Sequence, residues 1–134
     1  MFGFNEWLYQ LEKENTEKRC LEIGAGGGHL LRFLKTKGFE CHGIEPGNWA
    51  PSQSIFPDIA DLPYDDYDFF ILSDVLEHLE NPIKMLVQLK SIAGDNARIY
   101  CSFPNNDSLP ARLSRVNGEW FAHLGTFTTF HTNL

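Results

Sequence analysis

The sequence predicts an α/β fold, in which a doubly wound, mostly parallel sheet of about five strands carries helices on both faces. Three observations support it. Apolar runs typical of buried strands alternate with segments whose apolar residues recur at helical spacing. A glycine-rich turn stands between the first such run and the first crossover helix. The length of 134 residues is that of one domain, so we expect a single domain over 1–134 with its core in 19–104.

The first half of the chain holds four expected elements. They are an amphipathic helix over 4–14 whose apolar face holds Phe4, Trp7, Leu8 and Leu11, a strand over 19–23, a helix from Gly28 that Gly38 ends, and a strand over 39–45 that stops at Pro46. The next segment, 48–54, is too short and too rich in Pro and Ser to predict a helix, so the second crossover is expected to be abbreviated.

The second half continues the alternation of strand and helix. Its elements are a weak strand over 55–60, a strand over 67–73, a helix that Asn81 caps, Pro82 opens and Gly94 closes, and a fifth strand over 97–103. The run 67–73 is continuously apolar, as in strands that are buried on both faces, so we place it at the centre of the sheet. Residues 105–134 show little pattern beyond an aromatic stretch.

Composition argues against several classes of partner. The chain has 11 Lys and Arg residues against 18 Asp and Glu residues, a net charge of −7 and no basic block, so we expect no nucleic-acid partner. It has no apolar run long enough to span a bilayer and no signal-peptide pattern, so we expect no membrane association. Cys20, Cys41 and Cys101 lie singly in predicted strands, which indicates buried, reduced thiols and a cytoplasmic location.

The glycine turn is the first candidate site. Glycine occupies four of the five positions from Gly24 to Gly28, directly before a helix. Glycine permits positive φ and lets a ligand approach the backbone, and the start of a helix offers free N–H groups. We therefore predict a ligand-binding strand-turn-helix. The alternative is an ordinary strand-helix turn that happens to be rich in glycine.

An acidic residue, Glu45, lies at the carboxyl end of the second expected strand, 17 positions after Gly28. In doubly wound sheets a carboxylate at this place can accept both ribose hydroxyls of a nucleotide. The NAD fingerprint Gly-x-Gly-x-x-Gly, counted from Gly24, requires a third glycine where this chain has His29. An NAD-binding domain is therefore the less favoured alternative.

Four segments in the same order resemble class I S-adenosylmethionine-dependent methyltransferases. Residues 21–28 resemble motif I, 43–46 the acidic end of the second strand and 58–64 the loop that contacts adenine. Residues 73–82 resemble the segment after the fourth strand in the small-molecule branch that includes ubiquinone-biosynthesis O-methyltransferases. The resemblance implies a Rossmann-like fold and methyl transfer from S-adenosylmethionine to a small-molecule acceptor.

The resemblance also implies roles for particular residues. The expected cofactor-binding residues are Glu22, Gly24, Ala25, Gly26, Gly28, Glu45, Pro46, Asp58, Ile59 and Ser73. Among them, Glu45 would hold the ribose, Asp58 and Ile59 the adenine, and Glu22 would lie near the methionine amino group. Two alternatives stay open: Asp58 caps a loop, and Glu22 is a strand residue paired with a lysine.

Catalytic roles are expected for His78 and Asp74, which follow the central strand where an acceptor would lie. His78 can act as a base if the acceptor must lose a proton, and its alternative is a structural hydrogen bond. Asp74, Glu77, His78 and His123 could together suggest a metal cluster, but such scattered ligands are weak evidence and we expect no metal.

The C-terminal end departs from the family pattern. The family sheet has seven strands, the last two in an antiparallel hairpin, and this chain ends before that hairpin. We expect residues 105–134 to fold over the acceptor side or to form a homodimer, leaving the strand over 97–103 with an unpaired edge. The alternative functions are an inactive cofactor-binding fragment and a subunit that a partner completes.

Overall fold

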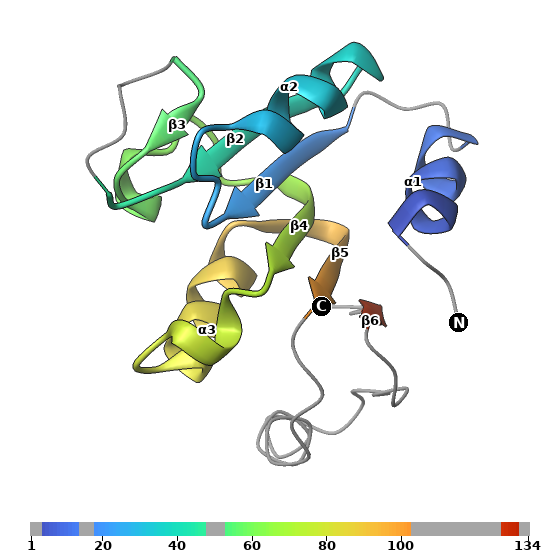
Figure 1. Ribbon diagram of the computed structural model, residues 1–134. Helices are drawn as coiled ribbons and strands as arrows, with labels where there is room; N and C mark the ends of the chain where they lie inside the picture. The colour runs from blue at the N-terminus through green and yellow to red at the C-terminus, as the bar shows by residue number, and fades with distance from the viewer. Residues whose placement is uncertain (1–3, 14–17, 48–52, 103–126, 132–134) are drawn as a thin grey trace.

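The computed structural model describes residues 4–13, 18–47, 53–102 and 127–131 (Figure 1). Its α-helices are α1 (Phe4–Lys13), α2 (His29–Thr36) and α3 (Pro82–Ser91). Its strands are β1 (Arg19–Ile23), β2 (Glu40–Ile44), β3 (Ile55–Phe56), β4 (Tyr67–Ser73), β5 (Ala93–Ser102) and β6 (Phe127–His131). Two short 3-10 helices, η1 (Ile59–Asp61) and η2 (Leu76–His78), complete the set.

The strands form one sheet in the order β3-β2-β1-β4-β5-β6. The first five are parallel, which confirms the predicted α/β fold. In the centre, Ile23 of β1 is in register with Ile44 of β2 and Leu72 of β4. The carboxyl ends of these three strands therefore meet at one edge of the sheet.

Packing on both faces explains why β4 is continuously apolar. Phe69 and Ile71 belong to a core that includes residues of α1 and α2, whereas Phe70 and Leu72 belong to a second core that includes residues of α3. Successive side chains of a strand point to opposite faces, so a strand with helices on both faces needs apolar residues throughout. Figure 1 shows α1 and α2 on one side of the sheet and α3 on the other.

The cysteines are all free and buried, as predicted. Cys20 and Cys41 face each other in the register between β1 and β2, and Cys101 lies in β5. The side chains of Trp7 and Leu11, expected on the apolar face of α1, lie outside the part that the structure describes. Of the helices that it does describe, none has the length and apolar character needed to cross a membrane.

Two expectations about the C-terminal half are wrong. Gly94 does not close α3, which ends at Ser91, because the chain turns at Ile92 and Gly94 already belongs to β5. The expected unpaired edge of β5 is also wrong, because β6 pairs with it antiparallel, with Ile99 opposite Phe130. Residues 103–126, over which much of the proposed dimer surface was predicted, lie outside the described ranges.

Candidate functional site

The glycine turn joins β1 to α2 in a conformation that favours glycine. Gly24, Gly26 and Gly28 have φ angles of 75°, 50° and 72°, all in the left-handed region. The N–H of Gly28 donates to the carbonyl of Ala25 at 2.8 Å and closes the turn. The N–H groups of Gly24 and Ala25 both donate to the carbonyl of Ile44, at 2.9 and 3.1 Å, and tie the turn to the end of β2.

Side chains from neighbouring elements bound the turn at both ends and leave its middle open. A Cβ atom at Gly24 would lie 2.7 Å from Cγ2 of Val75, and one at Gly28 would lie 2.9 Å from Cδ1 of Ile55. A Cβ atom at Gly26 would have nothing described within 4 Å. Side chains therefore lie against both ends of the turn, and the space beside half-buried Gly26 is open, so that a ligand could approach there.

Gly43 of β2 is a structural requirement that the sequence analysis missed. A Cβ atom there would lie 2.4 Å from Cβ of Ala25 and 2.8 Å from Cδ1 of Leu31. The absence of a side chain therefore lets the turn and α2 pack directly on β2. A glycine inside a predicted strand is the signal that could have identified this close approach.

Glu45 follows β2, and its carboxylate lies against the turn. Its Oε2 atom accepts a hydrogen bond from the N–H of Gly26, and its Oε1 atom accepts one from the N–H of Gly47, each at 3.0 Å. These bonds orient the carboxylate, and each oxygen keeps a lone pair for another donor. The structure thus brings together the turn and Glu45, which spacing and family resemblance linked in the sequence, and Pro46 directly follows Glu45.

Glu22 lies near the end of β1 and is only 8% exposed. Its Oε2 atom has no hydrogen-bond partner among the described residues, and burial raises the pKa of its carboxyl to about 7. No lysine in the described part of the chain forms an ion pair with it, which argues against the lysine-paired alternative. A buried carboxylate of this kind would be stabilised by a bound cation.

Asp58 and Ile59 lie in the loop that follows β3. The Oδ1 atom of Asp58 accepts a hydrogen bond from the N–H of Ala60 at 3.0 Å and caps η1, as the capping alternative predicted. Ile59 is partly buried and packs against the core cluster that includes residues of α3. The adenine-binding roles of both residues stay predictions.

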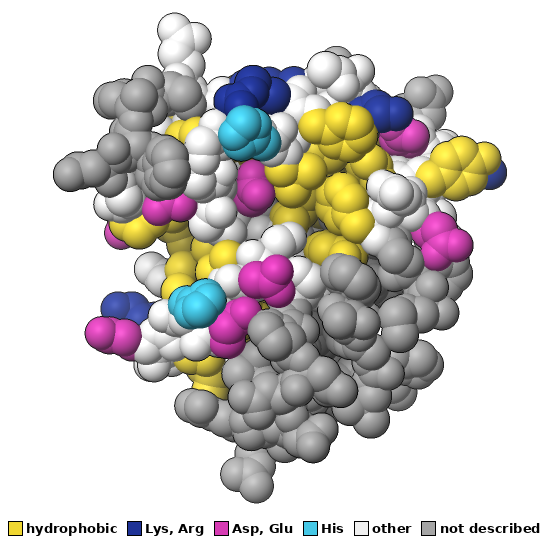
Figure 2. Space-filling view, viewed as in Figure 1, with side chains coloured by type: hydrophobic (Ala, Val, Ile, Leu, Met, Phe, Trp, Pro, Cys, Tyr) yellow, Lys and Arg dark blue, Asp and Glu magenta, His cyan; other side chains and the backbone are white. Residues whose placement is uncertain are grey.

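Ser73 and Asp74, both exposed, lie at the carboxyl end of β4. Asp74 has a φ of 52°, unusual for a residue other than glycine, and its N–H donates to the carbonyl of Ser102 at 2.8 Å. The η2 turn then places Glu77 and exposed His78 beside them, and the N–H of His78 donates to the carbonyl of Val75 at 3.0 Å. Figure 2 shows histidine and acidic side chains gathered over this part of the molecule.

A metal cluster is not formed by the described residues, among which no group of three or more His, Cys, Asp or Glu side chains could hold an ion. The Oε2 atom of Glu77 is buried and has no partner within these residues. His123, the fourth member of the cluster considered from sequence, lies outside them.

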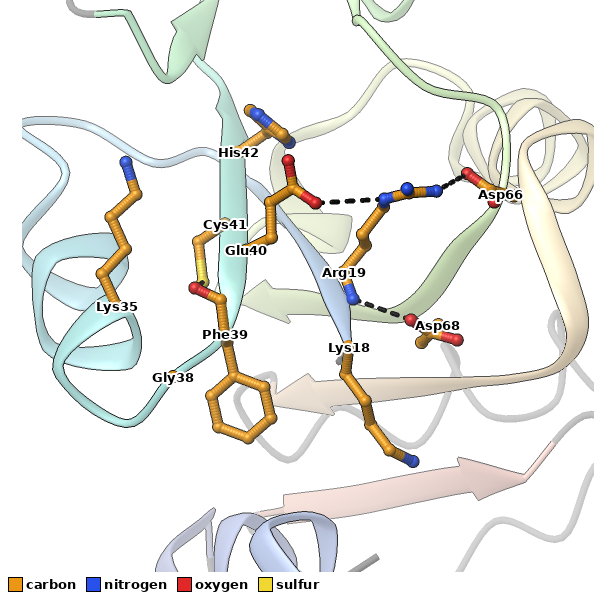
Figure 3. Close-up of a pocket in the computed structure, with 10 residues that line it drawn as sticks. All are labelled: Lys18, Arg19, Lys35, Gly38, Phe39, Glu40, Cys41, His42, Asp66 and Asp68. Atoms are coloured by element: carbon orange, nitrogen blue, oxygen red, sulfur yellow. Dashed lines mark hydrogen bonds and ion pairs between the residues drawn. The ribbon is translucent and has the colours of Figure 1, made fainter. Parts of the chain in front are cut away.

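A cavity of about 830 Å³ lies at the opposite edge of the sheet, where β1, β2 and β4 begin (Figure 3). Arg19 dominates one wall: its side chain bonds Glu40 at 3.1 Å and also Asp66, and its guanidinium lies 4.0 Å from the ring centroid of Tyr64. Arg19 is therefore already paired with two carboxylates, and ion pairs this close to the surface contribute little to stability. The cavity is remote from the glycine turn, so we place the candidate site at the carboxyl edge.

Comparison with known proteins gives a consistent family. The family described as Methyltransferase domain matches residues 5–132. An uncharacterized protein of Methanocaldococcus jannaschii is 31% identical over 122 residues, which cover 84% of this chain and 60% of that protein. An uncharacterized methyltransferase of Staphylococcus carnosus is 31% identical over 87 residues, which cover 58% of this chain and 42% of that protein.

Solved structures agree with this family. The plantazolicin methyltransferase BpumL in complex with SAH is 25% identical with a TM-score of 0.61, covering 84% of this chain and 49% of its own. A SAM-dependent methyltransferase of Aquifex aeolicus, 15% identical with a TM-score of 0.62 over 92% of this chain and 88% of its own, shares the fold. The chain thus spans 60% of the length of the M. jannaschii protein and 49% of that of BpumL. Because the family match extends over nearly all of its length, the chain belongs to the methyltransferase domain family.

Proposed function

We propose that this chain binds S-adenosylmethionine at the carboxyl edge of the sheet and transfers its methyl group to a small-molecule acceptor. We further propose that it belongs to class I and to the branch that includes ubiquinone-biosynthesis O-methyltransferases. The observation that carries the proposal is the Glu45 carboxylate, which the N–H groups of Gly26 and Gly47 hold against the glycine turn. A carboxylate so placed can accept two ribose hydroxyls without first reorganising.

The residues around the turn fit the charges of this cofactor. The open space beside Gly26 offers room for the ligand, and the unpaired, buried carboxylate of Glu22 would be stabilised by a positively charged amino group. One carboxylate at about 4 Å from a cation contributes roughly 4 kcal/mol at an effective dielectric near 20, before desolvation is subtracted. The crystallised complexes of BpumL with SAH support the choice of cofactor.

The bound cofactor would supply a methyl group on a positively charged sulfur, which is already activated for displacement. The protein then has to hold the acceptor in line with it, and positioning supplies much of the rate. We assign this task to the segment after β4, where Asp74 and His78 are exposed, and keep Ser73, the last residue of β4, as a cofactor-binding residue. His78 would accept a proton if the acceptor carries one at the reacting atom.

Calorimetry with S-adenosylhomocysteine tests the ribose role. Glu45→Ala should weaken binding by about 1 to 3 kcal/mol, the scale for losing hydrogen bonds to a charged group. Glu80→Ala is the matched control, because Glu80 is an exposed acid on the same chain with no place in the proposed site. Equal affinities of parent, Glu45→Ala and Glu80→Ala, all of them folded, would contradict the proposal.

A second candidate is a domain that binds the cofactor but needs further chain or a partner for activity. The observation in its favour is that the chain spans 60% of the M. jannaschii relative and 49% of BpumL. A methyl-transfer assay on protein that binds S-adenosylmethionine separates the two candidates.

A homodimer through 105–134 stays a prediction, which light scattering tests. The three free cysteines support a reducing, cytoplasmic location.

A further inference from the structure

Val75 connects the glycine turn to the segment that carries the proposed acceptor-binding residues. Its Cγ2 atom lies 2.7 Å from the position that a Cβ atom would take at Gly24. The two residues are therefore in direct contact. Gly24 is the first residue of the turn, and Val75 immediately follows Asp74. Val75 lies within the segment 73–82 but is not among the site residues expected from the sequence.

The backbone on either side of Val75 is held in place, so its side chain can transmit position. Before it, the N–H of Asp74 donates to the carbonyl of Ser102 in β5 at 2.8 Å. After it, Leu76 is 1% exposed in the core, and the N–H of His78 donates to the carbonyl of Val75 itself at 3.0 Å. The turn is anchored separately, because the N–H of Gly24 donates to the carbonyl of Ile44.

We propose that Val75 is a positioning residue that sets the distance between the cofactor-binding turn and the acceptor-side groups of Asp74 and His78. This inference rests on the proposed function and adds to it a steric connection between the two halves of the site. Close-packed side chains transmit small displacements because they have little free volume around them. In methyl transfer a displacement of about 1 Å between the reacting groups is costly, so such a contact bears on the rate.

Two-dimensional NMR with S-adenosylhomocysteine as the probe tests the connection. In the parent protein, addition of the probe should shift the backbone amide signals of Asp74 and His78 as well as those of the turn. In Val75→Ala the shifts at the turn should persist and those at Asp74 and His78 should be largely lost. Val75→Thr, which keeps the branched shape, should restore the parental response. Val87→Ala is the matched control, since Val87 is 57% exposed on α3.

A double-mutant cycle in the same proteins tests the contact itself. Gly24→Ala alone brings a Cβ atom against Val75, whereas in Gly24→Ala/Val75→Ala that clash is removed and only the strain of the positive φ remains. Affinity for the probe should therefore be about tenfold higher in the double variant than additivity of the single changes predicts, which is within the usual range for residues in contact.

The outcomes separate the inference from the proposed function. A parent protein that gives neither heat nor NMR shifts with S-adenosylhomocysteine would overturn both. A parent that binds the probe, combined with unchanged shifts at Asp74 and His78 in Val75→Ala or with additive affinities in the cycle, would overturn the role of Val75 and leave the proposed function intact. A general loss of structure in Val75→Ala would show in all signals. In that case Gly24→Ala decides, because its Cβ atom would press on Val75 and should alter the probe-induced shifts at Asp74 and His78, and parental shifts there would overturn the role of Val75.

Discussion

The buried carboxyl of Glu22 should make the stability of this protein depend on pH in the direction opposite to that of most acidic residues. Burial raises its pKa from the usual 4.5 to about 7. Between these values the unfolded chain has lost the proton and the folded chain still holds it, so stability falls as pH rises. Below about 4.5 both states are protonated and the effect disappears, and above about 7 it is complete.

The size of the effect follows from the same two pKa values. Because one pKa unit corresponds to about 1.4 kcal/mol, the rise from 4.5 to about 7 represents about 3 kcal/mol of stability lost above neutral pH. Glu22→Gln removes the ionisation and keeps the shape of the side chain. Urea unfolding should therefore show Glu22→Gln gaining about 2 to 3 kcal/mol over the parent between about pH 4 and about pH 8.

The same carboxylate links stability to binding. If Glu22 faces the amino group of the cofactor, affinity for S-adenosylhomocysteine should rise as pH increases through about 7 in the parent, and Glu22→Gln should remove this dependence. Glu80→Gln, at an exposed position, should behave like the parent in both assays. A stability difference between Glu22→Gln and the parent that stays constant with pH would refute the reasoning, because it would mean that Glu22 titrates equally in the folded and unfolded chains.

Two further predictions concern packing and catalysis. Gly43→Ala should destabilise the protein by about 1 to 3 kcal/mol in urea unfolding, because its Cβ atom would lie 2.4 Å from that of Ala25. Gly27→Ala, whose Cβ atom would have only His29 atoms at 3.5 Å or more near it, should lower the stability less. Similar losses of stability in the two variants would contradict the packing argument. His78→Asn should slow methyl transfer to a proton-bearing acceptor while leaving S-adenosylhomocysteine affinity unchanged in calorimetry, and equal turnover would leave His78 a structural residue.

Local chemistry made several elements predictable. The bounds of β1 and β4 agree with those expected, because apolar runs bordered by turn residues have little freedom to shift. Asn81 caps α3 through a 2.9 Å bond from the N–H of Lys84 to its Oδ1 atom, followed by Pro82 as predicted. Gly38, with a φ of 90°, follows α2 as expected. Each of these features depends on neighbours within a few residues along the chain.

Contacts between distant segments were less accessible. The predicted strand over 55–60 shrinks to Ile55–Phe56, since η1 begins three residues later. The pairing of β6 with β5 joins residues at least 25 positions apart, from Ser102 opposite Phe127 onward, and neither strand's own pattern specifies that partner. The contact of Val75 with Gly24 likewise depends on β1 and β4 being neighbours in the sheet.

The sequence by itself determined the alternation of strand and helix, the glycine turn and an acid at the end of the next strand, because backbone freedom, hydrophobic periodicity and spacing are local properties. Only the tertiary structure decided that the Glu45 carboxylate meets the N–H of Gly26, that Glu22 is buried without a described partner and that Val75 fills the space beside Gly24. These features arise when parallel strands align their carboxyl ends, since packing then brings together groups that the chain separates by up to some fifty residues.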